Sequence, residues 1–163
     1  MTDTSIIETI ATADHPVPVD RVQVSAIVPE GYRKVINLDG YVAKAVEEPL
    51  GDLIKLRASQ LNGCTYCVDM HSVDLQSGGF PLRKVFAVSA WRESPWFTER
   101  ERTALELTEA VTLIHQGGVS EALYARALNE FGEVGFADLI LAIGTINLWN
   151  RIAIPTRMHP PAL

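Results

Sequence analysis

The chain has 163 residues, enough for one compact domain and too few for two of ordinary size. Apolar residues make up 47% of it and charged residues 21%, so it can bury a core and is not a disordered segment. Its net charge of −6 argues against proteins that bind nucleic acid or anionic membranes, because both need a basic surface. The 2 cysteines are too few for a disulfide-rich scaffold.

The N-terminal segment carries acidic residues and lacks a basic start followed by an apolar run, so no secretory signal is visible. No uninterrupted apolar stretch reaches the roughly 18 residues of a membrane span. The best candidate, residues 136–154, is interrupted by polar residues such as Asp138 and Asn150. We therefore expect a cytoplasmic protein with no membrane span, in a reducing compartment that disfavours structural disulfides.

Residues 1–31 are expected to form an extended N-terminal arm. Pro16 and Pro18 each disfavour helix in the residue before them. Pro29-Glu30-Gly31 adds a second break, and only residues 22–24 have any strand character.

From residue 32 onward, the spacing of apolar residues predicts seven helices. They are expected over residues 32–46, 50–61, 64–76, 81–91, 98–115, 120–131 and 136–152. Asn62-Gly63 is typical of a helix end, and Thr98-Glu99-Arg100-Glu101 fits the capping box that begins a helix. The predicted class is all-α, with one helical domain over residues 32–163. The last helix is apolar around most of its circumference, which suggests a central or intersubunit position.

Three reactive side chains follow the turn at Asn62-Gly63. A helix that begins at Cys64 places Cys64 and Cys67 one turn apart on one face, and His71 follows four residues after Cys67 on that face. A helix N-terminus stabilises a thiolate, and a nearby imidazole can take the thiol proton. A second cysteine three residues away can capture a sulfenic acid as a disulfide, which an external dithiol then reduces. The stripe therefore favours thiol redox chemistry.

Other interpretations of these residues stay open. Free cysteines are often buried as small apolar residues, and a histidine can be an ordinary core residue. Cys64, Cys67 and His71 could also be three ligands of a structural zinc. However, no fourth ligand lies nearby in the sequence, so we expect no metal ion. Nothing in the sequence requires a haem, flavin or other cofactor.

The segment from Leu53 to His71, and above all its S-Q-x-N-G-C-x-Y-C-x-x-x-H string, resembles the core motif of the alkylhydroperoxidase D-like proteins. These proteins belong to the carboxymuconolactone decarboxylase superfamily. Two further stretches, 91–110 and 146–151, look like the same family, so the resemblance covers roughly residues 32–152.

The resemblance implies an all-α bundle that is an obligate oligomer, a trimer or hexamer. It also implies reduction of hydroperoxides by a CxxC pair that cycles between dithiol and disulfide. In such proteins the second cysteine, here Cys67, is paired with the histidine, here His71, and a glutamate on the preceding helix completes a proton relay through water. The reductant is a dithiol on a lipoyl-bearing protein, and electrons can pass on to a peroxiredoxin.

This sequence departs from the pattern at the relay acid, where Asp52 stands twelve residues before Cys64. The carboxylate is kept on a shorter side chain, and Glu48, Glu93 or Glu101 could replace it in space. Asp52 could also serve only its helix N-terminus. We expect the catalytic set Cys64, Cys67, His71 and Asp52.

In the expected peroxidase cycle, the Cys67 thiolate attacks the peroxide and Cys64, the more exposed thiol, resolves it. The alternative function is a disulfide reductase or thiol-redox sensor that uses the same pair. A lactone decarboxylase of the same superfamily would not rely on a CxxC pair, so the presence of both cysteines counts against it.

Overall fold

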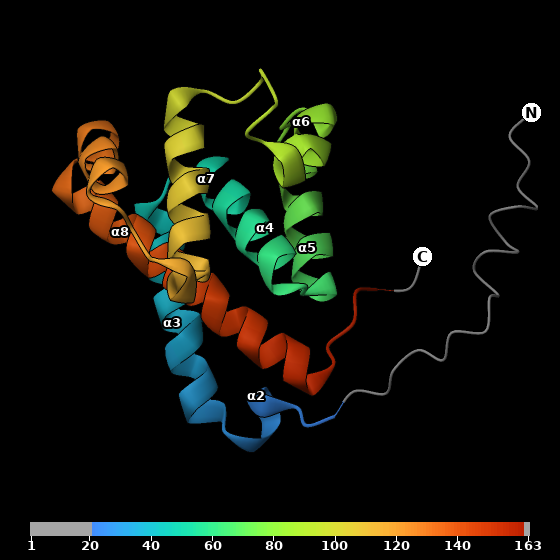
Figure 1. The fold of residues 1–163 in the computed structure, drawn as a ribbon. Helices are drawn as coiled ribbons and strands as arrows, with labels where there is room; N and C mark the ends of the chain where they lie inside the picture. The colour runs from blue at the N-terminus through green and yellow to red at the C-terminus, as the bar shows by residue number, and fades with distance from the viewer. Residues whose placement is uncertain (1–20, 162–163) are drawn as a thin grey trace, which may run out of the picture.

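A computed structural model describes residues 21–161, and in this range the chain forms seven α-helices, two short 3-10 helices and no strand (Figure 1). The α-helices are α2 (Val24–Ile27), α3 (Pro29–Ala45), α4 (Leu50–Asn62), α5 (Thr65–Ser77), α6 (Leu82–Ala87), α7 (Glu99–Thr112) and α8 (Glu121–Thr156). The 3-10 helices are η1 (Val88–Ala90) and η2 (Ile114–Gln116). The predicted all-α class is confirmed.

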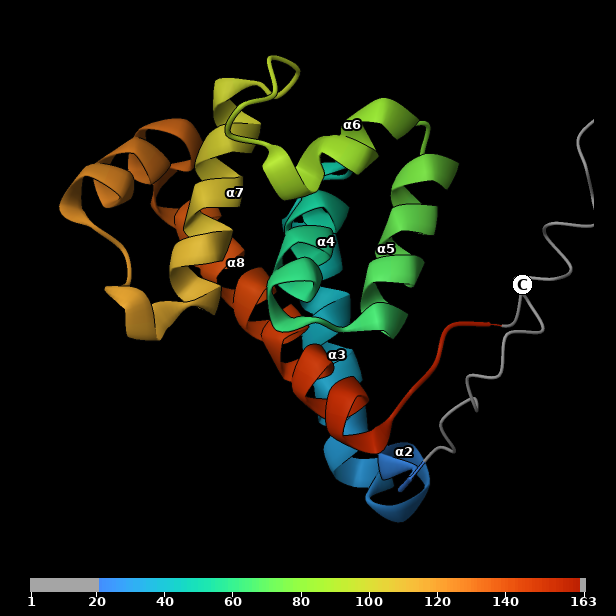
Figure 2. The same cartoon turned by 45° about the vertical axis from the view of Figure 1, so that its right-hand side comes forward.

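Helix α4 lies at the centre of the bundle. It contacts α5, α7 and α8, while α3 packs along α8 on the other side (Figures 1 and 2). The core is built from apolar side chains of these helices, including Leu53, Ile54, Leu56, Leu105, Leu107, Leu139 and Ile143, all almost fully buried. Both α4 and α5 contact α8, so the turn between them, which carries the cysteines, lies against α8.

The two helices predicted over residues 120–131 and 136–152 are two parts of one long helix, α8. They join at a bend where Gly132 has φ 69° and ψ 177°. An L side chain at that φ is strained, so glycine is the residue that permits the bend. The predicted N-cap is confirmed, since the Ser120 side chain accepts the amide N–H of Leu123 at 3.2 Å.

By length and composition α8 could cross a membrane, the one such helix among residues 21–161. Its packing argues otherwise. The helix contacts α3, α4 and α7, and its buried side carries Asp138, Thr145 and Asn150. Asp138 accepts a hydrogen bond from the Tyr41 hydroxyl of α3 at 2.8 Å. These contacts and buried polar residues show that α8 packs as part of the helical bundle.

The N-terminal prediction needs correction where the structure describes it. Residues 1–20 of the expected arm lie outside the described range. Residues 22–24 form no strand, because α2 begins at Val24, and α3 begins at Pro29 rather than at residue 32. Pro29 suits the first turn of a helix, where its missing N–H would have no partner and its fixed φ is already helical. Pro29-Glu30-Gly31 therefore starts a helix instead of preventing one.

Other predicted bounds shift by a few residues. The segment predicted as one helix over 81–91 is divided between α6 and η1, and α7 ends at Thr112, before His115. The capping box at its start is confirmed, because the Thr98 hydroxyl accepts the Glu101 amide and the Glu101 carboxylate accepts the Thr98 amide. The third predicted helix begins at Thr65, with Cys64 as its N-cap.

Candidate functional site

The turn between α4 and α5 fixes the position of the cysteines. Gly63 ends α4 with φ 73° and ψ 31°, the left-handed conformation that glycine adopts without strain. The Cys64 amide then donates to the Ser59 carbonyl at 3.0 Å. This turn places Cys64 at the N-cap of α5, with Cys67 in the first turn of that helix.

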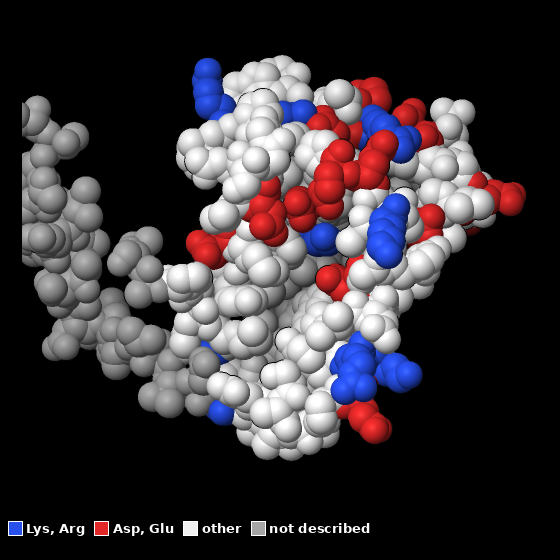
Figure 3. Space-filling view, turned by 180° about the vertical axis from the view of Figure 1, so that it is seen from behind, with Lys and Arg blue, Asp and Glu red and all other residues white. Residues whose placement is uncertain are grey.

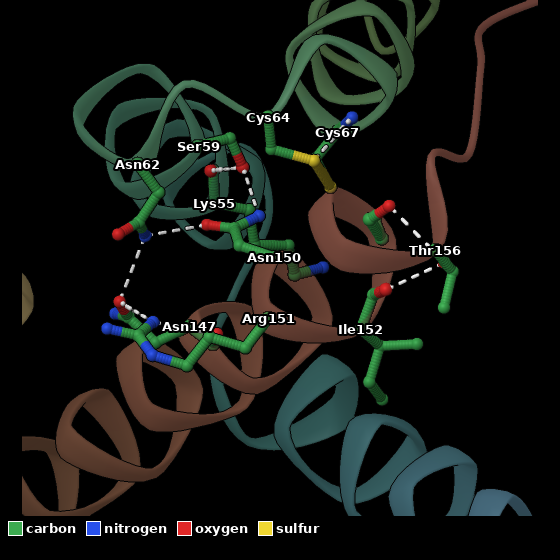
Figure 4. The surroundings of a disulfide bond; sticks show 11 residues. Lys55, Ser59, Asn62, Cys64, Cys67, Asn147, Asn150, Arg151, Ile152 and Thr156 are labelled. Atoms are coloured by element: carbon green, nitrogen blue, oxygen red, sulfur yellow. Dashed lines mark hydrogen bonds between the residues drawn. A yellow bond between two sulfur atoms is a disulfide. The ribbon is translucent and has the colours of Figure 1, made fainter. Parts of the chain in front are cut away.

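Cys64 and Cys67 form a disulfide, with their Cα atoms 5.4 Å apart (Figure 4). The Sγ atom of Cys64 also accepts the Cys67 amide N–H at 3.3 Å. Both residues are 2% exposed, which contradicts the expectation that Cys64 is the more exposed of the two. Tyr66, Ala153 and Met158 pack against the pair. Met158 follows the end of α8, and this cover could not be inferred from the CxxC motif alone.

A polar network holds the α4–α5 turn against α8 (Figure 4). The Asn62 side-chain amide donates to the side-chain oxygens of Asn150 at 2.8 Å and Asn147 at 3.0 Å. Asn150 is fully buried and donates in turn to the Ser59 hydroxyl at 3.1 Å. Asn62 therefore does more than shape a turn, because it connects the turn to the core helix.

His71 lies between two carboxylates. Its Nδ1 is 3.5 Å from Oδ1 of Asp52 on α4 and 3.4 Å from Oδ2 of Asp74, one turn further along α5. The His71 side chain is only 7% exposed, that of Asp52 is 16% exposed and that of Asp74 is 48% exposed. Neither ring nitrogen of His71 makes a hydrogen bond of good geometry. Asp52, chosen from the sequence, therefore faces His71 with its shorter side chain.

The surroundings of Asp52 favour its ionised form. Burial alone would raise its pKa, but the contact with His71 and the charge of Lys55 outweigh this, so the pKa lies below the usual 3.8. Lys55 Nζ is 3.4 Å from the same Oδ1 atom that faces His71. Asp52 thus remains an acceptor beside Nδ1 at neutral pH, as a group that orients an imidazole must.

The other acids considered for this position have different partners. Glu48 accepts the Asp52 backbone amide at 3.2 Å, and its pKa is raised above 4.5 by burial and by the neighbouring charge of Asp52. Glu101 binds Lys84 at 2.5 Å and closes the capping box, while Glu93 is exposed. The acid that sequence reasoning missed is Asp74, although its spacing three residues after His71 on a helix was a usable signal.

A cavity of about 230 Å³ opens beside this group. It is lined by Tyr32, Asp39, Lys55, Tyr66, Cys67, Met70, His71, Ile146, Trp149, Ala153 and Met158. Cys67 reaches the cavity wall, whereas Cys64 does not line it. Among the lining residues, the rings of Tyr32 and Trp149 pack edge to face, with their centroids 5.3 Å apart. The cavity surface is mainly apolar, and both Cys67 of the disulfide and His71 line it.

The surface seen from behind carries a band of acidic side chains, with separate Lys and Arg side chains beside and below it (Figure 3). This agrees with the net charge of −6 and gives this face no basic patch for a phosphate backbone.

The carboxymuconolactone decarboxylase family model matches residues 29–110, from the start of α3 into α7. The chain belongs to this family. The matched region includes both cysteines, His71, Asp52 and Asp74.

Two relatives are close enough to support the family assignment. YdfG of Bacillus subtilis, an uncharacterized protein, is 37% identical over 135 residues, which are 82% of this chain and 92% of that protein. A protein of unknown function from Agrobacterium tumefaciens, described as the putative antioxidant defence protein AhpD, is 36% identical with a TM-score of 0.86. That match covers 89% of this chain and 100% of the other.

A second solved structure supports the fold alone. The uncharacterized peroxidase-related protein of Ralstonia eutropha JMP134, with an alkylhydroperoxidase AhpD core, is 21% identical with a TM-score of 0.74. The match covers 97% of this chain and 84% of that one. The family member described here therefore has the AhpD-like fold, as its sequence motif led us to expect.

Proposed function

We propose that this protein is a thiol peroxidase that reduces organic hydroperoxides through Cys64 and Cys67. The observation that carries the proposal is the position of the disulfide. Cys67, one of its two residues, lines a mainly apolar cavity that His71 also lines. A redox-active pair, a base and a space for an apolar substrate therefore meet at one place. The description of the Agrobacterium relative as a putative antioxidant protein supports the same class of chemistry.

In the proposed cycle, the negative charge of Asp52 3.5 Å from Nδ1 favours the Nδ1–H tautomer of His71, so Nε2 accepts the Cys67 thiol proton. The Cys67 thiolate attacks one peroxide oxygen and the O–O bond breaks. Cys67 becomes a sulfenic acid, and the alkoxide takes the proton back from His71 to leave as an alcohol. The Cys64 thiol then displaces hydroxide from the sulfenic sulfur, forming the disulfide and one water.

Two contacts support the assignment of Cys67 as the attacking thiol. Cys67 borders the cavity, and Cys64 does not. The Cys64 sulfur instead accepts the Cys67 amide N–H, which suits a resolving thiol held close to its partner. A charge-assisted contact between a thiolate and an imidazolium is worth about 1.5–3 kcal/mol, more than the roughly 0.3–1 kcal/mol of a helix N-terminus, so we propose that His71 favours a thiolate at Cys67.

An external dithiol completes the cycle by reducing the disulfide. We propose a dihydrolipoyl group on a partner protein as this reductant, with a peroxiredoxin as a further electron acceptor. We also propose that the protein is a cytoplasmic homo-oligomer, a trimer or hexamer. Sedimentation that finds a monomer at micromolar concentration would contradict the last point.

The test is turnover of cumene hydroperoxide with dihydrolipoamide as the reductant. We expect activity in the wild type, its loss in Cys67→Ser and its retention in Asp69→Asn, which removes one exposed charge from the same helix. Full activity in Cys67→Ser would overturn the proposal. Slow oxidation by peroxide combined with fast exchange with a protein disulfide would instead identify a disulfide reductase or thiol-redox sensor.

A further inference from the structure

His71, Asp52 and Asp74 together form a group whose chemistry extends beyond a proton relay. One donor atom from each residue can be chosen so that all three lie within 4.8 Å of one another. They come from two helices, since Asp52 lies on α4 and the other two on α5. Helix packing, and not only a local sequence motif, therefore brings the three side chains together.

The imidazole supplies a second, separate observation. His71 is more than nine-tenths buried, and neither of its ring nitrogens has a hydrogen-bond partner of good geometry. Its Nδ1 points between the carboxylates at 3.5 Å and 3.4 Å, too far for good hydrogen bonds. A buried polar atom without a hydrogen bond is costly, so this nitrogen is suited to bind a ligand.

We propose that Asp52, His71 and Asp74 bind a divalent transition-metal ion, with Zn²⁺ the best fit. Zinc binds imidazole nitrogen and carboxylate oxygen at about 2.0–2.2 Å, so two ligands at a tetrahedral ion lie about 3.4 Å apart. The two distances from Nδ1 agree with that separation. Water takes the fourth position. This ligand set contains no cysteine and differs from a zinc site built on Cys64, Cys67 and His71.

The charges around the group permit such an ion. Two carboxylates face it, and Lys55 Nζ lies 3.4 Å from Oδ1 of Asp52, the same oxygen that faces His71. A carboxylate has about four acceptor positions, so Asp52 can bind an ion while it keeps its lysine. Asp74 is 48% exposed, and this open side gives an ion a route from solvent to the buried nitrogen.

The consequence for activity rests on the proposed peroxidase function. An ion on Nδ1 leaves the imidazole proton on Nε2, so His71 can no longer accept the Cys67 proton. It also takes the Asp52 carboxylate that orients the ring. Zinc is therefore a reversible inhibitor of the peroxidase, released by a chelator.

Binding is tested on the full-length protein in its disulfide form, in which the cysteines are not available as ligands. Co²⁺ is titrated while its visible absorption is followed, and Zn²⁺ binding is measured by equilibrium dialysis. We expect one ion per chain, with at least tenfold weaker binding in Asp74→Asn and in Asp52→Asn. Asp69→Asn makes the same charge change at another exposed position of α5 and should bind within twofold of the wild type.

Failure to bind one ion per chain would overturn the proposal, as would equal affinity of Asp74→Asn and Asp69→Asn. Circular dichroism establishes that each variant is folded, and the exposed position of Asp74 makes its variant safe in this respect. The binding measurement needs no peroxidase activity. If the ion binds as expected but peroxide turnover is absent, the metal site stands and the proposed function is wrong.

Discussion

The Nδ1 atom of His71 lies 3.5 Å from the Oδ1 atom of Asp52, across the interface between α5 and α4. The family resemblance implies a glutamate at the position of Asp52. The shorter aspartate still brings its carboxylate close to the His71 imidazole. Helices α4 and α5 pack directly against each other, and this packing places the Asp52 carboxylate beside the imidazole.

The first prediction concerns this pair. Replacing Asp52 with Asn keeps the size of the side chain but removes its charge and the preference for the Nδ1–H tautomer. Peroxide turnover should fall by about tenfold to a hundredfold, less than the roughly 10²–10⁴-fold of a group that itself transfers the proton, because Asp52 acts through His71. Asp52→Glu should retain most of the activity. Steady-state kinetics over a range of pH measure both variants, and an unchanged rate and pH profile for Asp52→Asn would remove Asp52 from the mechanism.

The second prediction concerns the order of the thiols. In Cys64→Ser, one equivalent of cumene hydroperoxide should convert Cys67 to a sulfenic acid that a dimedone probe traps. In Cys67→Ser, the remaining Cys64 does not border the cavity and should be labelled far more slowly. Mass spectrometry of the labelled peptides locates the adduct. Faster labelling of Cys64 than of Cys67 would reverse the assignment.

The third prediction concerns access to the disulfide. Met158 packs against two cysteines that are each 2% exposed. Met158→Ala removes this cover and should increase the rate of reduction by dithiothreitol several-fold. Leu148→Ala, at an exposed apolar residue of the preceding helix α8, is the control and should leave the rate unchanged. Equal reduction rates in the two variants would show that Met158 does not limit access.

The fourth prediction concerns the polar network beneath the turn. Asn150→Ala should lower the free energy of unfolding by about 1–3 kcal/mol, because Asn62 and Ser59 lose buried partners. Asn129→Ala makes the same change at an exposed position of α8 and should cost about 0.5 kcal/mol or less. Urea denaturation measures both. Equal losses in the two variants would mean that the network adds little stability.

The fifth prediction concerns pH. The pKa of Glu48 is raised above 4.5 by burial and by Asp52, so folding favours its protonated form. Its favourable contribution is complete below pH 4.5 and is lost as the pH rises through the folded-state pKa. Glu48→Gln should therefore unfold at a higher temperature than the wild type at neutral pH.

That advantage should disappear below pH 4.5, where Glu48 of the wild type is itself protonated. Asp52 acts in the opposite sense, since its lowered pKa stabilises the fold above pH 3.8 and that contribution is lost on acidification. Glu133→Gln, at an exposed glutamate of α8, is the control. A neutral-pH difference that persisted unchanged into acid would rule out the charge of Glu48 as its cause.

Local patterns explain which parts of the fold could be predicted. The Thr98–Glu101 capping box, the glycine end of α4 and the Ser120 cap depend on a few neighbouring residues, and each is found as predicted. The start of α3 was missed because Pro29 suits both a break and a first helical turn. The sequence predicts two helices where the structure has α8, because a glycine such as Gly132 is compatible both with a bend inside a helix and with the end of one.

The sequence by itself determined the all-α class, the family and the positions of Cys64, Cys67 and His71 along one helix, because helix spacing and short motifs are local properties of a chain. Only the tertiary structure decided how the site is enclosed. In that structure Asp52 of α4 lies beside His71, and Cys67 but not Cys64 lines the cavity. Met158 packs against the disulfide. These contacts join residues from separate helices, and the packing of α4 and α8 around one core fixes them.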